Sequence, residues 1–217
     1  MATAVKERPI LFSAPMVQAI LRGEKTQTRR VAKPPAKAAF LPDDFWKNDP
    51  DEPGSAYLDD FSGRLRISCP YGVPGDRLWM REAWAVGACA DGLSPLMLHA
   101  PTWLRDNGGL WYPADDHSPT SPISRRGTTR PSIHMPRWAS RITLEATEVR
   151  VQRLQEITEE DAKAEGVEAK PGTYTADFAL HGYVESFAEL WNSINGKKHP
   201  WESNPWVWAV TFRRIGD

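Results

Sequence analysis

The sequence has little cysteine, no long hydrophobic run and almost no net charge. Cys69 and Cys89 are its two cysteines, and no Cys-x-x-Cys pair occurs. We therefore expect reduced thiols in a cytoplasmic protein, not a disulfide scaffold. The first residues, MATAVKERP, have no apolar core, and no run reaches the length of a membrane span. We expect neither a signal peptide nor contact with a membrane.

The formal net charge is −1, so no overall field draws the chain to nucleic acid. Any such binding would depend on a local basic patch. The histidines show no metal-ligand spacing, either with one another or with the cysteines, so we expect no metal site. They are His99, His117, His134, His181 and His199.

A length of 217 residues predicts one domain with large insertions, or two very small domains. The patterns favour strands at 9–12, 139–154 and 204–215, with a register change near Thr147, and a turn that leads into a strand within 69–84. They favour helices from Ser13 to Gly23, from Thr158 to Gly166 and over 183–196. Segments at about 32–63 and 86–130 are rich in Gly, Pro and Asp and are expected to be irregular insertions. Several strands with few short helices indicate an α+β fold built on a small β-barrel.

The stretch GEKTQTRR, residues 23–30, follows the first predicted helix. A turn after Gly23 would let the Lys25 amine approach the Thr28 hydroxyl, a pairing of base and nucleophile. The alternative is simpler. Basic residues after a helix C-terminus stabilise the helix dipole and are solvated there, and spacing alone favours that reading.

Glu165 ends the helix ITEEDAKAEG, where a carboxylate meets the unfavourable end of the helix dipole. An acid in such a place is a candidate for general acid–base work, although a solvated surface Glu is the commoner case. The segment 122–141 is basic and contains His134 and Trp138, a composition typical of phosphate contact and base stacking. Acidic segments elsewhere would balance the same charges equally well.

Three of these motifs occur together in a known family. GEKTQTRR, VPGDRLWMRE and ITEEDAKAEG resemble the ASCH domain, a relative of the PUA domain. The segments PSIHMPRWASR and NPWVWAVTF make the chain similar to the phage and bacterial branch of that family. The resemblance covers residues 8–215 as a single domain, apart from the two expected insertions, and implies a PUA-like β-barrel with surrounding helices.

One small bacterial branch of this family is similar to amidohydrolases that act on N4-acetylcytidine. The resemblance implies a catalytic set of Lys25, Thr28 and Glu165, with no cofactor and no metal. Lys25 would act as base, Thr28 as nucleophile, and Glu165 would handle the proton of the leaving amine. Weaker candidates for holding the base or sugar are Arg29, Trp79, Glu82, His134 and Trp138. The chain is about twice as long as the minimal members, so we expect either a lid or a second contact to substrate that changes the specificity.

Two alternatives remain open at this point. The first is a module that binds RNA or a modified base in the same cleft without chemistry. The second is a ribonuclease, because a lysine beside a hydroxyl can also promote phosphodiester cleavage. The near-neutral charge weighs against nonspecific RNA binding, and the intact Lys, Thr and Glu set favours the hydrolase.

Overall fold

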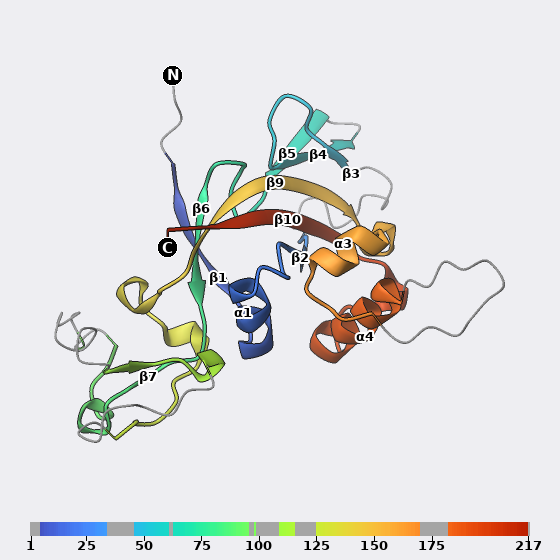
Figure 1. The fold of residues 1–217 in the computed structure, drawn as a ribbon. Helices are drawn as coiled ribbons and strands as arrows, with labels where there is room; N and C mark the ends of the chain where they lie inside the picture. The colour runs from blue at the N-terminus through green and yellow to red at the C-terminus, as the bar shows by residue number, and fades with distance from the viewer. Residues whose placement is uncertain are drawn as a thin grey trace.

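A five-stranded mixed sheet forms the centre of the protein (Figure 1). The structure is a computed structural model and describes residues 5–33, 46–60, 63–95, 98, 109–115, 125–169 and 182–216. The strand order is β1-β6-β9-β10-β2; β1 pairs with β6 in parallel, and the other pairs are antiparallel. These strands are β1 (Glu7–Leu11), β2 (Gln27–Val31), β6 (Arg77–Arg81), β9 (Thr143–Arg153) and β10 (Trp206–Ile215).

Among the described residues, three α-helices lie against this sheet: α1 (Ala14–Leu21), α3 (Glu159–Ala164) and α4 (Tyr183–Asn195). In Figure 1 the long strands β9 and β10 run side by side across the molecule, with α1 beneath their middle and α3 and α4 at one end. The 3₁₀ turns are Ala88–Ala90, Pro113–Asp115, Ser132–His134, Arg137–Ala139, Leu154–Glu156 and Trp201–Ser203. In the described part of the chain, no helix is both long enough and apolar enough to cross a membrane.

The expected α+β class is confirmed, and each of the four predicted strands and three predicted helices overlaps an observed one. The register change near Thr147 is also confirmed. Glu148 pairs with Thr211 and Ala146 with Phe212, so Thr147 is the extra residue of a bulge. The cap at Thr158 is present, since its hydroxyl accepts from the Asp161 amide at 3.1 Å. Ser13 precedes α1 as expected, but its hydroxyl makes no capping bond.

The expected irregular segment at about 32–63 contains strands, which corrects that prediction. A three-stranded antiparallel sheet is formed by β3 (Trp46–Asn48), β4 (Ser55–Asp60) and β5 (Gly63–Ser68). Its strands are short, and Asp, Pro and Gly around them hide the alternation. The Asn48 side chain exchanges two hydrogen bonds with the Val151 backbone, at 2.9 and 2.6 Å, and so joins β3 to β9. Residues 34–45 lie outside the described part.

The second expected insertion, at about 86–130, is partly described. It contains a short antiparallel pair, β7 (Ala85–Val86) and β8 (Leu110–Trp111). A small core around Trp84 and Met135 lies beneath this pair. Residues 96–97, 99–108 and 116–124 lie outside the described part, so the expectation of irregularity is not tested there.

The main core lies on one face of the large sheet, under α1. It contains Ile10, Phe12, Leu78, Val210 and Phe212. A second core joins α3 and α4 to the opposite face through Phe187 and Trp191. In α4 the helical spacing predicts an apolar face of Val184, Phe187, Leu190, Trp191 and Ile194. The structure buries or half-buries these residues except for Ile194, which is 53% exposed. The sheet therefore has apolar layers on both sides near β2, and this is the arrangement that surrounds the candidate site.

Candidate active site

Strand β2 places its side chains alternately on the two faces of the sheet. Arg29 lies over the Phe187 ring of α4, at 5.8 Å from the ring centroid, and Arg30 lies over Phe12 on the α1 side, at 5.3 Å. Thr28 is buried and lies opposite Val210 of the main core. Gln27 and Arg29 thus face the α3–α4 side, and Thr28 faces the α1 side.

Lys25 and Glu165 meet at the free edge of β2. The two residues form an isolated backbone bridge, and the Thr26 amide donates to the Ala164 carbonyl at 2.8 Å. The turn after α3 therefore pairs with the chain that leads into β2. This pairing covers an edge that would otherwise expose unpaired backbone groups.

Gly166 permits this close approach. Its φ is +79°, and a Cβ atom added there would lie 2.8 Å from the Cβ of Lys25. Any other residue would combine a left-handed backbone with a clash. The sequence AEG thus has a physical meaning here: Ala164 supplies a carbonyl, Glu165 a carboxylate, and Gly166 the space for Lys25.

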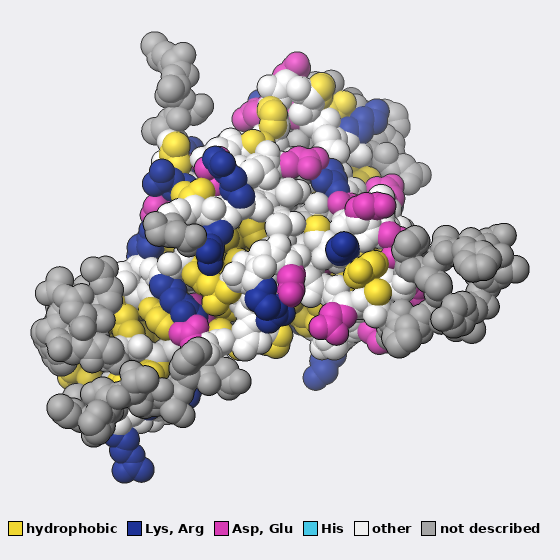
Figure 2. Space-filling model, in the orientation of Figure 1, with side chains coloured by type: hydrophobic (Ala, Val, Ile, Leu, Met, Phe, Trp, Pro, Cys, Tyr) yellow, Lys and Arg dark blue, Asp and Glu magenta, His cyan; other side chains and the backbone are white. Residues whose placement is uncertain are grey.

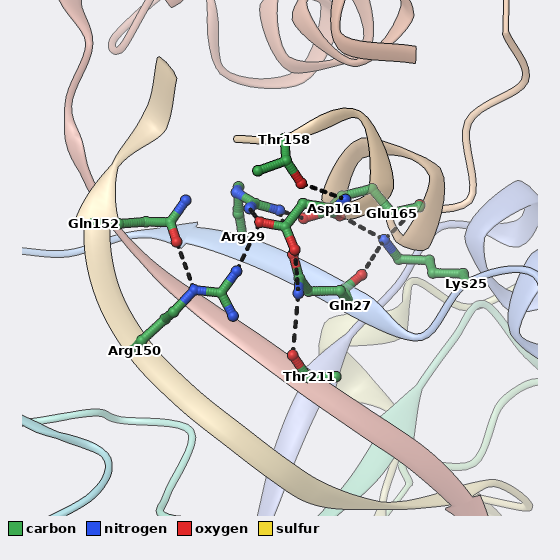
Figure 3. A network of polar contacts seen from close by, with 9 residues as sticks. All are labelled: Lys25, Gln27, Arg29, Arg150, Gln152, Thr158, Asp161, Glu165 and Thr211. Carbon is green, nitrogen blue, oxygen red and sulfur yellow. Dashed lines mark hydrogen bonds and ion pairs between the residues drawn. The ribbon is translucent and has the colours of Figure 1, made fainter. Parts of the chain in front are cut away.

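The side chains of Lys25 and Glu165 form a buried ion pair (Figure 3). Their exposed fractions are 1% and 4%, and the Lys25 Nζ–Glu165 Oε2 distance is 2.7 Å. The ammonium also donates to the carbonyls of Gln27 and Glu165, both at 2.8 Å. All three protons of Lys25 are therefore directed at acceptors, and the Thr28 hydroxyl is not one of them.

Burial lowers the pKa of Lys25 below its ordinary value, because desolvation penalises the charged ammonium. Glu165 acts in the opposite direction, through its charge and its hydrogen bond. Arg29 and Arg30 add a smaller lowering effect. Lys25 is thus a lysine whose proton is less tightly held than usual and whose nearest group is a carboxylate.

Arg29 links this pair to a larger polar network. Its guanidinium donates to Glu165 Oε1 at 3.2 Å, to Gln27 Oε1 at 2.5 Å and to Asp161 Oδ2 at 2.7 Å. Glu165 is thereby held between two cations, Lys25 on one oxygen and Arg29 on the other. Asp161 lies one helical turn before Glu165, so α3 directs both acids toward β2.

The strand register explains how the network closes over the sheet. Arg29 of β2 and Arg150 of β9 are both paired with Ala209 of β10, whose small side chain leaves room above it. Both arginines donate to Asp161 Oδ2, each at 2.7 Å. In Figure 3 the Asp161 carboxylate lies above the strands, between the two guanidinium groups. The remaining members are Gln27, Gln152, Thr158 and Thr211.

Two donors in this network have no hydrogen-bond partner among the described residues. They are Nε of Arg29 and Nε2 of Gln152. Sequence reasoning missed Gln27, Arg150, Gln152 and Asp161. Two sequence features could have identified these residues. One is the alternation of side chains in QTR (27–29) and VRVQ (149–152), and the other is the acid four residues before Glu165.

The other predicted binding residues have their contacts elsewhere. Trp79 lies beside the guanidinium groups of Arg81 and Arg137, at 5.4 and 5.9 Å. Glu82 forms a buried ion pair with Arg141 at 2.9 Å, and Trp138 packs edge-on against Trp84. None of these contacts involves Lys25, Arg29 or Glu165.

His134 is exposed on a 3₁₀ turn. In the described part of the chain, two of the five arginines in the basic segment form ion pairs with acids. Arg137 pairs with Glu7, and Arg141 with Glu82 and Asp115. The four weaker candidates therefore stay predictions, whereas Lys25, Arg29 and Glu165 are brought together.

In the residues that the structure covers, no group of three or more His, Cys, Asp or Glu side chains is placed to hold a metal ion. Cys69 is a buried free thiol, and burial raises its pKa to about 12. Such a thiol is a poor nucleophile. Comparison of the chain with family models, with curated proteins and with solved structures finds no match.

Proposed function

We propose that this protein is an amidohydrolase that cleaves the exocyclic amide of N4-acylated cytosine nucleosides, such as N4-acetylcytidine. The observation that carries the proposal is the buried contact of 2.7 Å between Lys25 and Glu165, residues 140 positions apart. Burying two charges costs free energy that a stabilising role alone seldom recovers. Perturbed, paired and buried groups of this kind are concentrated at functional sites.

The PUA-like (ASCH) barrel belongs to the same proposal. The sheet has two ends, β1 and β2. Arg30 of β2 donates to the carbonyl of Leu11 in β1 at 2.5 Å, so a side chain spans the two ends. This contact supports a barrel-like curvature in which α1 lies over the opening.

In the proposed mechanism, the Lys25 ammonium first passes a proton to Glu165 across their contact of 2.7 Å. The neutral Lys25 amine then accepts the proton of Thr28 Oγ as that oxygen attacks the acyl carbonyl. The tetrahedral intermediate collapses, the carbon–nitrogen bond breaks, and the exocyclic amine leaves with a proton delivered from the Lys25–Glu165 pair. Water then hydrolyses the acyl-Thr28 ester to a carboxylic acid. Arg29 keeps the Glu165 carboxylate in place throughout. The assigned residues need no metal or cofactor.

The test is incubation of the protein with N4-acetylcytidine, with cytidine release followed by chromatography. Lys25→Ala, Thr28→Ala and Glu165→Ala are expected to lower kcat/KM by at least about a hundredfold, the usual range for loss of an acid–base group. Lys163→Ala and Glu160→Gln are matched controls on the exposed side of α3. Mass spectrometry of the quenched wild-type enzyme should show an acyl group on Thr28.

The same variants separate the alternatives. Absence of cytidine release from every acylated nucleoside would refute the hydrolase. RNA cleavage that is lost in these variants would favour a ribonuclease. Binding without turnover, unchanged by Glu165→Ala, would favour a module that binds RNA or a modified base.

A further inference from the structure

A cavity opens between the C-terminal end of α1 and the C-terminal end of β10. Its volume is ≈ 300 Å³, within the range of small-molecule sites. The α1 side contributes Ile20, Leu21, Arg22 and Gly23, and the opposite wall is formed by Lys25, Thr26, Phe212, Arg213 and Arg214. We call this space the arginine pocket.

The charge of the arginine pocket has one sign. Arg22, Lys25, Arg213 and Arg214 line it, and no acidic residue does. Figure 2 agrees in outline, because Lys and Arg are frequent toward the sheet end where the termini lie, and acids are frequent around α3 and α4. Three of these four cations form ion pairs with acids that do not line the pocket, namely Glu24, Glu165 and Glu145.

Two arginines of this pocket, Arg22 and Arg213, are available to a stronger anion. Arg22 pairs with Glu24, and their side chains are 56% and 53% exposed. Arg213 pairs with Glu145, and their side chains are 67% and 27% exposed. Exposed ion pairs of this kind hold their partners weakly. A phosphate group offers more negative charge and accepts paired hydrogen bonds from guanidinium groups, so it can displace such carboxylates.

The pocket and the candidate active site share a wall. Lys25 belongs to both, and the Phe212 amide donates to the Thr26 carbonyl at 2.8 Å. The Thr211 hydroxyl accepts a hydrogen bond from Gln27, which belongs to the polar network around Glu165. Arg213 and Arg214 follow Thr211 by two and three residues along β10. At a strand rise of about 3.3 Å per residue, they lie roughly 7–10 Å further along β10. That span is of the order of one nucleotide.

We infer that the arginine pocket binds a phosphate on the sugar of the substrate, so the preferred substrate is an N4-acylated cytidine nucleotide and not the free nucleoside. This inference rests on the proposed function. It assigns the acyl group to Lys25 and Thr28 and the phosphate to the arginine pocket. It also supplies a second substrate contact, which is one of the two consequences expected from the size of the chain.

The experiment compares hydrolysis of N4-acetylcytidine with that of its 5′-monophosphate and of a short oligoribonucleotide carrying the same base. We expect kcat/KM for the monophosphate to exceed that for the nucleoside by at least about tenfold, the worth of one hydrogen bond between charged groups. In Arg213→Ala/Arg214→Ala that ratio should fall to about one. A preference for the oligonucleotide that the double variant also abolishes would identify RNA as the source of the phosphate.

Arg77→Ala is the matched control. Arg77 and Arg213 are both paired across the sheet with Glu145, but Arg77 does not line the pocket. The control should keep the wild-type ratio. Equal rates for nucleoside and monophosphate in the wild type, or a ratio that the double variant leaves unchanged, would overturn the inference.

A binding measurement distinguishes failure of this inference from failure of the proposed function. Calorimetry with cytidine 5′-monophosphate and with cytidine requires no turnover. Tighter binding of the monophosphate, lost in Arg213→Ala/Arg214→Ala, would support the pocket even if no acylated compound were hydrolysed. Equal binding of the two ligands, with hydrolysis intact, would support the proposed hydrolase activity and refute the phosphate site.

Discussion

At the residue scale, Glu165 controls how readily Lys25 loses its proton. Glu165 raises the pKa of Lys25 against the larger lowering effect of burial. Glu165→Gln should therefore lower the pKa of Lys25 further, so the neutral amine forms at lower pH than in the wild type. NMR titration of the lysine side chains measures this directly, and the ascending limb of any residual pH–activity profile should shift the same way. Glu160→Gln is the control, and a Lys25 titration that moves upward in Glu165→Gln would contradict the assignment.

Asp161 provides a second test at this scale. Burial raises its pKa, but Arg29, Arg150 and Gln27 outweigh that effect, so the pKa lies below its ordinary value. Asp161→Asn leaves two guanidinium groups facing each other, and we expect a loss of about 2–3 kcal/mol in the free energy of unfolding. Because the folded pKa is depressed, the contribution of Asp161 is present above its unfolded pKa, near pH 4, and is lost as the pH falls.

Urea unfolding of Asp161→Asn and of the wild type at several pH values measures both effects. The difference between the two proteins should be largest near neutral pH and should narrow below about pH 4. A constant difference across this range would mean that the carboxylate charge is not what stabilises the network.

At the element scale, the turn after α3 and the turn after α1 carry comparable glycines with different surroundings. Gly166 and Gly23 have similar φ angles, +79° and +77°, but a Cβ atom would clash with Lys25 only at Gly166. Gly23→Ala should cost about 1 kcal/mol from backbone strain alone. Gly166→Ala should cost clearly more and should also reduce activity, because Lys25 and Glu165 must move apart. Equal losses of unfolding free energy in thermal or urea denaturation would show that the close approach is unimportant.

The strands and turns also show which parts of the structure the sequence could predict. Strand alternation in β9 indicated even the bulge at Thr147, because apolar residues change parity there. The sheet of β3, β4 and β5 was missed, since its strands are short and depend on docking to β9 through Asn48. Lys25 and Glu165 were expected to act together only by family resemblance. Their contact depends on pairing between segments far apart in the chain, which no local pattern reveals.

At the scale of the whole molecule, an ion-pair cluster around Arg141 connects residues 110–115 to the part of the protein built on the large sheet. Arg141 pairs with buried Glu82 at 2.9 Å and with Asp115 at 2.6 Å, and it stacks on Tyr112 at 4.0 Å. Gln18 of α1 donates to the Ala114 carbonyl in the same segment. This cluster fixes the segment against α1, the helix that also forms one wall of the arginine pocket.

Arg141→Ala should therefore destabilise the protein by about 3–5 kcal/mol, because it leaves the Glu82 carboxylate buried without a partner. Burial already raises the pKa of Glu82, and Arg141 opposes that rise. Without Arg141 the folded pKa rises further, so the variant loses stability as the pH rises from the unfolded pKa of about 4.3 toward the folded value. Urea unfolding should show a deficit that is small near pH 4 and grows toward pH 7.

Two further variants complete this last prediction. Asp115→Ala removes the partly exposed partner, and it should cost less than about 1 kcal/mol. Glu82→Gln combined with Arg141→Ala removes the unpaired charge, so it should recover part of the loss and flatten its pH dependence. A double variant as unstable and as pH-dependent as Arg141→Ala alone would show that lost packing on Tyr112, and not the buried carboxylate, accounts for the effect.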